Sequence, residues 1–137
     1  MIVLDTHVLV WAVDGDSRLG QTARAAIEET ERTDRIAVSA ITPWEIALLA
    51  DKGRLRLGRD VAVWIDTALG LPGVRLIPIA PALAIDSVRL PGSFHADPAD
   101  RLIIATARHC SAPLLTADRA ILDYAAGGHV SVIDASR

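Results

Sequence analysis

Met1-Ile2-Val3-Leu4-Asp5-Thr6 opens the chain with an apolar run that ends abruptly at an acid. Further short apolar runs follow at residues 36–38, 74–79, 114–115 and 130–133. Their apolar residues are continuous rather than alternating, which is typical of strands buried on both faces of a parallel sheet. Pro78 indicates that the third run lies at a sheet edge or a strand end.

Helical patterns separate these runs. The expected helices cover residues 20–33, 43–51, 60–69, 81–88, 98–110 and 118–126. The pattern over 98–110 is apolar on nearly every side, which predicts a buried helix. Because strands and helices alternate, we predict a three-layer α/β/α sandwich with a mostly parallel central sheet of about five strands. The length fits a single domain over residues 1–137.

The composition excludes several classes of protein. Hydrophobic residues make up 51% of the chain and charged residues 23%, which is too apolar for a disordered protein. The single cysteine, Cys110, excludes an internal disulfide framework and a cysteine-based zinc site. The start of the chain has no signal-peptide pattern, and no apolar run is long enough to span a membrane. We therefore expect a soluble, cytoplasmic protein that does not contact membranes.

Four acids fall where the predicted strands and helices meet. Asp5 follows the first strand, Glu45 and Asp100 open two of the helices, and Asp118 follows the fourth strand. In open α/β sheets, ligands bind beyond the carboxyl ends of the strands, next to helix N-termini. The four carboxylates are therefore expected to lie on one rim of the molecule.

Each acid could instead have a purely structural role. Thr42-Pro43-Trp44-Glu45 has the layout of a capping box with a proline at the first helical position. A helix N-cap or a turn would likewise account for Asp5, for Asp97 with Asp100, and for Asp118. Asp5 fits such a role least well, because a lone charge at the end of a buried strand is energetically costly.

A metal ion would account for acids that converge. Carboxylates repel one another unless a cation is near, and an all-oxygen ligand set suits Mg²⁺ or Mn²⁺ better than zinc. Such ions commonly act on phosphate esters. The chain carries a formal charge of −3, which by itself argues against nucleic acid as a partner. Without the four acids, however, the scaffold has 13 acidic and 14 basic residues.

The order of these motifs resembles the PIN-domain ribonucleases of the VapC toxin family. The acids are spaced 40, 55 and 18 residues apart. The matching stretches are Leu4–Trp11, Ser39–Ala47, Lys52–Leu55, His95–Ala107 and Leu115–Asp118. Each motif alone is weak, but the ordered set covers nearly the whole chain.

This resemblance implies Mg²⁺-dependent endonucleolytic hydrolysis of RNA, with Mn²⁺ as a substitute ion. It makes Asp5, Glu45, Asp100 and Asp118 the catalytic and metal-binding acids, with Asp5 and Asp100 as direct ligands. Three further residues are expected to support them, namely Thr6, Asp97 and Thr116. The resemblance also implies a homodimer and neutralisation by a VapB-type antitoxin. The expected products carry a 5′-phosphate and a 3′-hydroxyl.

Basic and aromatic residues add weaker predictions. The candidate RNA-binding residues are Arg54, Arg56, Arg59, Arg101 and Arg119, for which a solvated surface is the competing interpretation. We expect His7 to be a packed or capping residue, and Trp11, Trp44 and Trp64 to lie in the core. The high hydrophobic content also predicts an apolar surface that awaits a partner, either a dimer face or an antitoxin groove.

Two other classes of protein remain as alternatives, namely a non-nucleolytic α/β phosphotransfer domain and a non-catalytic interaction module. A phosphotransfer domain of the receiver type needs an acidic pair after the first strand and a lysine near the last, which this chain lacks. A phosphatase of the haloacid dehalogenase type needs an aspartate where His7 stands. A non-catalytic interaction module with the same fold is disfavoured because all four acids are present.

Overall fold

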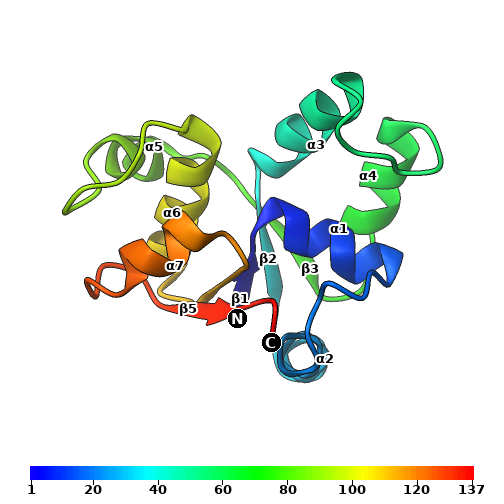
Figure 1. Cartoon of the computed structure of the whole chain (residues 1–137), viewed down its shortest axis with the longest axis horizontal. Helices are drawn as coiled ribbons and strands as arrows, with labels where there is room; N and C mark the ends of the chain where they lie inside the picture. Colours follow the sequence, from blue (N-terminus) through cyan, green and yellow to red (C-terminus); the bar gives the residue numbers. More distant parts are fainter.

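The computed structural model describes residues 1–137 and has a five-stranded sheet in which every pairing is parallel. The strands are β1 (Ile2–Leu4), β2 (Ile36–Ser39), β3 (Val74–Ile77), β4 (Leu114–Thr116) and β5 (Val132–Asp134). Their order across the sheet is β3-β2-β1-β4-β5, so the first strand lies at the centre (Figure 1). The fully parallel sheet confirms the predicted architecture.

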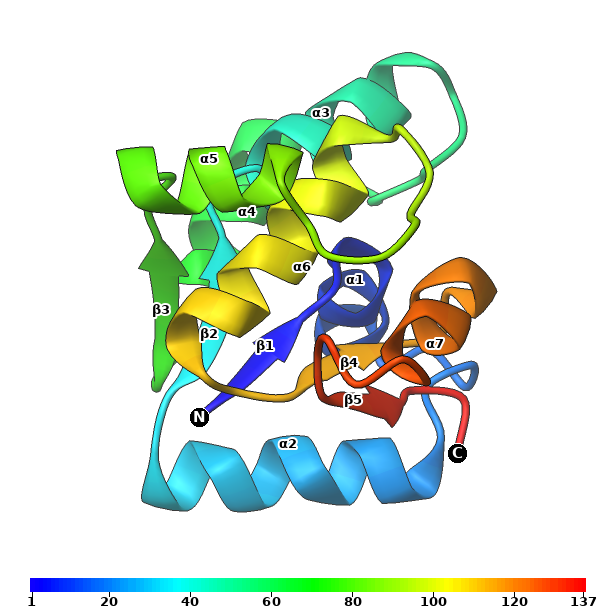
Figure 2. The same cartoon turned by 90° about the vertical axis from the view of Figure 1, so that its left-hand side faces the viewer.

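Seven helices cover the two faces of the sheet. They are α1 (Thr6–Asp14), α2 (Gln21–Thr33), α3 (Thr42–Asp51), α4 (Val61–Leu69), α5 (Pro81–Val88), α6 (Pro98–Cys110) and α7 (Arg119–Ala125). The first four lie on one face and the last three on the other, which gives the three layers (Figures 1 and 2). None of the helices is both long and apolar enough to cross a membrane.

The central strands explain the continuous apolar runs. Leu4 points into a core formed with α1, α2, α3 and α4, whereas its neighbour Val3 points into a second core under α6 and α7. Val3 pairs in register with Ala37 and Leu114, and all three side chains are fully buried. β3 is an edge strand, as Pro78 predicted, and its residues are only partly covered.

Helix α1 was not among the predicted helices. Its sequence, Thr6-His7-Val8-Leu9-Val10-Trp11-Ala12-Val13-Asp14, lacks a polar face because the helix packs against the sheet and its neighbours. Its ends nevertheless carry ordinary signals: the side chain of Asp5 caps the first turn, and Gly15 ends the helix with a positive φ of 65°.

Two other interpretations of the sequence differ from the structure. Thr42 is not the cap of α3, because the helix already includes it and the capping position falls to Ile41, which makes no side-chain cap. The buried Thr42 hydroxyl instead lies 3.1 Å from the Thr6 hydroxyl. Trp44 is not a core residue, because it faces outward from α3 and is 55% exposed. Trp64, by contrast, is buried as predicted.

Candidate active site

The site forms where the central strands end and helices begin. β1 runs directly into Asp5, and β4 ends at Thr116, two residues before Asp118. The first turns of α3 and α6 bring Glu45 and Asp100 to the same end of the sheet (Figure 1). A parallel sheet places the carboxyl ends of its strands together, which explains why acids so far apart in the chain share one site.

Asp5 is the most buried of these acids, with 3% of its surface exposed. The Thr6 backbone N–H donates to its Oδ1 at 2.8 Å, and the Thr116 hydroxyl donates to its Oδ2 at 2.7 Å. Burial raises the pKa of Asp5, while the nearby His7 and the Thr116 hydrogen bond oppose that rise. The carboxylate is thus held in one orientation by its neighbours.

Thr116 links Asp5 to Asp118. Its hydroxyl oxygen accepts a hydrogen bond from the Asp118 backbone N–H at 3.0 Å. Asp118 also caps α7, since its Oδ1 accepts from the Ile121 N–H at 3.1 Å. Asp118 therefore has the structural role that the sequence left open as an alternative to a catalytic one, and the cap leaves its other carboxylate oxygen available.

His7 has the structural role that we predicted. Its Nε2 accepts a hydrogen bond from the Ala117 backbone N–H at 3.1 Å, and its ring packs edge-on against Trp11. Its Nδ1 lies 3.6 Å from Oδ2 of Asp5. His7 therefore ties the turn after β4 to the start of α1.

The remaining acids form a tight cluster. Glu45, Asp97 and Asp100 each offer a carboxylate oxygen within 4.8 Å of the others, which is close enough to share one metal ion. Asp97 caps α6 by accepting from the Asp100 N–H at 3.1 Å, as its spacing predicted. Glu45 belongs to no capping box, so its carboxylate is not held by the helix backbone and can take part in the cluster.

The charges of the other four acids act on Asp100. Its pKa is raised from an ordinary 3.8 to about 8, first by burial and then by Asp5, Asp97, Asp118 and Glu45. The pKa of Glu45 is raised as well, mainly by burial, although a hydrogen bond from Thr6 opposes the shift. The structure thus clusters Glu45 and Asp100 with Asp97, and it places Asp5 and Asp118 near enough for their charges to raise the pKa of Asp100.

None of the five acids forms an ion pair with a lysine or an arginine. The only basic side chains close to their carboxylates are the imidazoles of His7, at 3.6 Å from Asp5, and His95, at 3.3 Å from Asp100. Clustered carboxylates with oxygen donors alone fit a hard divalent cation, which would offset their mutual repulsion. The residues present therefore fit a metal ion.

The predicted RNA-binding arginines do not share one environment. Arg54, Arg56 and Arg59 are exposed in the connection between α3 and α4, and Arg119 is exposed at the start of α7. The guanidinium of Arg101 instead donates hydrogen bonds to three backbone carbonyls. Arg101 is thereby tied to the protein itself, whereas RNA contact by the other four stays a prediction.

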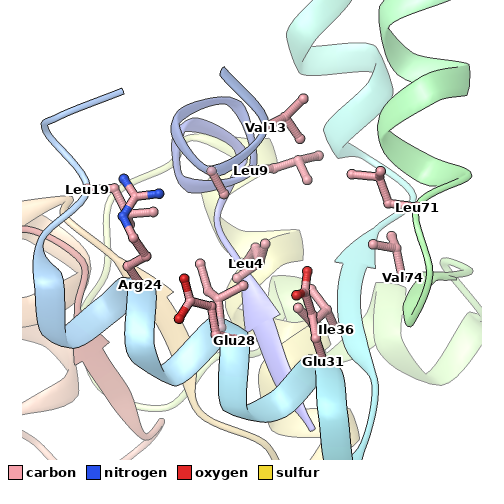
Figure 3. A pocket seen from close by; sticks show the side chains of 12 residues that line it. Leu4, Leu9, Val13, Leu19, Arg24, Glu28, Glu31, Ile36, Leu71 and Val74 are labelled. Atoms are coloured by element: carbon pink, nitrogen blue, oxygen red, sulfur yellow. The ribbon is translucent and has the colours of Figure 1, made fainter. Parts of the chain in front are cut away.

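An apolar pocket lies outside the cluster of five site acids. It has a volume of about 190 Å³ and is lined by side chains from α1, α2, β2 and the segment that follows α4, including Leu9, Ile36 and Leu71 (Figure 3). Three charged side chains of α2, Arg24, Glu28 and Glu31, line the same opening. The pocket therefore combines an apolar floor with one basic and two acidic side chains.

Replacing Thr116 with valine is expected to lower the free energy of unfolding by about 1–3 kcal/mol. The buried Oδ2 of Asp5 loses its hydrogen-bond donor, and the Asp118 backbone N–H loses its acceptor. Thr116→Ser keeps the hydroxyl and should lose much less. Urea unfolding of both variants at neutral pH measures the difference. Equal stabilities for valine and serine would show that the hydroxyl does not support the site.

Comparisons with known proteins agree with this geometry. The model of the PIN domain family matches residues 2–127. Ribonuclease VapC22 of Mycobacterium tuberculosis is 40% identical over 123 residues, which cover 90% of this chain and 91% of that protein. The crystal structure of VapBC2 from Rickettsia felis bound to a promoter DNA fragment has a TM-score of 0.71, at 18% identity and 98% coverage of both chains.

FitAcB from Neisseria gonorrhoeae also has the same fold, with a TM-score of 0.67 at 23% identity over 98% of this chain and 97% of that one. These two structural likenesses concern the fold alone. Family membership is shown by the family match over most of the chain and by the 40% identity to a relative of similar length. The chain therefore belongs to the PIN-domain family, alongside the VapC ribonucleases.

Proposed function

We propose that this chain is a Mg²⁺-dependent endoribonuclease and the toxin of a toxin–antitoxin pair, able to use Mn²⁺ as well. One observation carries the proposal: five carboxylates converge at the carboxyl end of a PIN-family sheet, and no lysine or arginine side chain neutralises them. The identity to Ribonuclease VapC22 supports RNA as the substrate.

The acids divide into two groups by their surroundings. Glu45, Asp97 and Asp100 lie close enough to hold one ion together, whereas Asp5 and Asp118 are joined through Thr116. A divalent ion, when bound, polarises a phosphate oxygen and lowers the pKa of a water molecule. We assign direct coordination to Asp5 and Asp100, and to Glu45 and Asp118 the role of holding the ion or its waters.

The supporting residues orient these acids. Thr116 donates to Asp5, and Thr6 donates to it through the backbone while its hydroxyl lies beside Thr42. Asp97 adds a carboxylate to the Glu45–Asp100 pair and caps the helix that carries Asp100. The proposed hydrolysis leaves a 5′-phosphate and a 3′-hydroxyl.

The experiment that tests this function uses the purified chain without antitoxin and a labelled single-stranded RNA. We expect cleavage with Mg²⁺ or Mn²⁺, complete loss in EDTA, and recovery when the metal is restored in excess. Cleavage that continues in EDTA would contradict the metal site. RNA that stays intact with either metal would favour the non-catalytic interaction module.

The partner that we propose is a VapB-type antitoxin, since the similar structures include VapBC2 and FitAcB. The pocket between α1 and α2 is a candidate place for it, because an apolar antitoxin side chain with a basic neighbour would match the apolar floor and the acidic Glu28 and Glu31. We also propose a homodimer in the cytoplasm, with residues 1–137 as one PIN-like domain.

Replacing Leu71 with glutamate is expected to weaken antitoxin binding by about tenfold or more, because it puts a charge into a desolvated apolar contact. Leu71 lines the pocket and is 40% exposed, so the change does not enter the closed core. Leu76→Glu is the matched control, since Leu76 is similarly exposed on β3 and outside the pocket. Calorimetric titration with the antitoxin from the adjoining reading frame measures both affinities. Equal affinities would place the antitoxin elsewhere.

A further inference from the structure

The connection between α5 and α6 is fastened to the start of α6 by one side chain. The Arg101 guanidinium donates to the carbonyl oxygens of Ser87 and Phe94, each at 3.1 Å, and to that of His95 at 3.0 Å. Two of these hydrogen bonds hold the connection, residues 89–97, which has no regular structure of its own, and the third reaches the last turn of α5. The backbone of His95 is thereby fixed relative to Asp100.

The ring of His95 is fixed as well. Its Nδ1 accepts a hydrogen bond from the Asp97 backbone N–H at 3.2 Å, which places the ring proton of the neutral imidazole on Nε2. The Phe94 ring packs on it with centroids 4.1 Å apart, and Tyr124 packs on Phe94 in turn. The Tyr124 hydroxyl donates to the Pro91 carbonyl oxygen at 2.5 Å, which secures the far end of the connection.

This arrangement presents the Nε2–H edge of His95 to the candidate metal site. Nε2 lies 3.3 Å from Oδ2 of Asp100, and the Asp100 side chain is 17% exposed. No lysine or arginine lies within ion-pair distance of that carboxylate, and His95 is the only basic side chain that does. An imidazole nitrogen this close to one carboxylate oxygen restricts rotation of the carboxylate and leaves its other oxygen for a shared ligand.

We propose that His95 is a positioning residue for Asp100, and that Arg101 holds His95 in place rather than binding RNA. The inference rests on the proposed function, because it assigns Asp100 to the metal site. His95 sets the orientation of the Asp100 carboxylate, and Arg101 sets the position of His95 through its backbone carbonyl. Partners of this kind typically change metal affinity or activity by about 10–100-fold.

The test compares two substitutions at His95 with a matched histidine. His95→Ala is expected to weaken Mn²⁺ binding, measured by calorimetry, and to lower kcat, each by about tenfold, with KM for RNA within about twofold of the original. His95→Gln, whose amide can place an N–H near Asp100, should recover most of both losses. His109→Ala, an exposed histidine at the far end of α6, is the control and should change neither.

Arg101→Ala is compared with Arg89→Ala. Arg89 is an exposed arginine in the same connection, and its side chain makes no hydrogen bond in the structure. A positioning role predicts that Arg101→Ala reproduces the His95→Ala losses in kcat and Mn²⁺ affinity, while Arg89→Ala does not. If Arg101→Ala instead raised KM and left kcat unchanged, and if the salt dependence of its RNA binding fell by about one phosphate contact, Arg101 would be an RNA-binding residue.

Asp100→Asn separates this inference from the proposed function. Full activity in Asp100→Asn would overturn the proposed function, and the inference with it. If Asp100→Asn is inactive but His95→Ala keeps the original kcat and Mn²⁺ affinity, the inference alone is overturned. If Arg101→Ala fails to fold, the His95 variants still test the inference by themselves. A His95→Ala variant with unchanged Mn²⁺ affinity then overturns the inference.

Discussion

Replacing Asp100 with asparagine is expected to lower the rate of RNA cleavage by more than about a hundredfold. Asparagine keeps the shape of the side chain but removes the charge that a divalent cation needs. Residues that merely orient metal ligands are worth ~10–100-fold, so a direct ligand should be worth at least that much. Asp5→Asn should have an effect of similar size, because its buried carboxylate belongs to the same site.

Single-turnover cleavage of a labelled RNA at saturating Mg²⁺ measures this loss. Asp123→Asn is the control, since Asp123 is an exposed acid on α7 that does not contribute to the charge acting on Asp100. Its rate should stay within about twofold of the original. If Asp100→Asn and Asp5→Asn both cleaved RNA as fast as Asp123→Asn, the acids would not form the active site.

The second large effect concerns stability, because the metal-free protein should become less stable as pH rises from about 4 to about 8. The folded protein holds the Asp100 proton up to its raised pKa of about 8, whereas the unfolded chain releases it near 3.8. Between these values unfolding releases a proton, which lowers stability by at most about 1.4 kcal/mol per pH unit for one group. Asp5 and Glu45, whose pKa values are also raised, act in the same direction.

Thermal unfolding between pH 5 and 9, in EDTA and with Mn²⁺, measures this dependence. In EDTA the Tm should fall toward pH 8, and Asp100→Asn should flatten the fall and raise the Tm at pH 8. Mn²⁺ should raise the Tm most at the alkaline end, because the ionised carboxylates bind it. A Tm in EDTA that rises toward pH 8, or an Asp100→Asn variant with the original slope, would show that repulsion within the cluster does not destabilise the fold.

The sheet could be predicted from the sequence because its signals are local. Continuous apolar runs mark strands buried on both faces, and Pro78 marks the edge strand. Helix α1 escaped prediction because burial on several sides removes the polar face on which helical periodicity depends. The cap at Asp5 and the glycine at position 15 were the available signals.

The site was predictable only in part, for a related reason. Acids that follow strands in a parallel sheet must meet at one edge, so Asp5, Glu45, Asp100 and Asp118 could be grouped without a structure. Arg101 could not be assigned, because its hydrogen bonds join it to a connection whose path no local pattern determines. The exposed Trp44 shows the same limit, since a large apolar residue on a short helix does not reveal which side faces the core.

The ends of the cleaved RNA test the central claim most directly. Hydrolysis by a metal-activated water at the acid cluster should leave a 5′-phosphate and a 3′-hydroxyl, formed with Mg²⁺ and absent in EDTA. Mass spectrometry of the products from antitoxin-free protein identifies both ends. We predict a ligatable 3′-hydroxyl on every product. A 2′,3′-cyclic phosphate that forms equally well in EDTA would contradict the account, because that chemistry uses the RNA's own 2′-hydroxyl and needs no metal site.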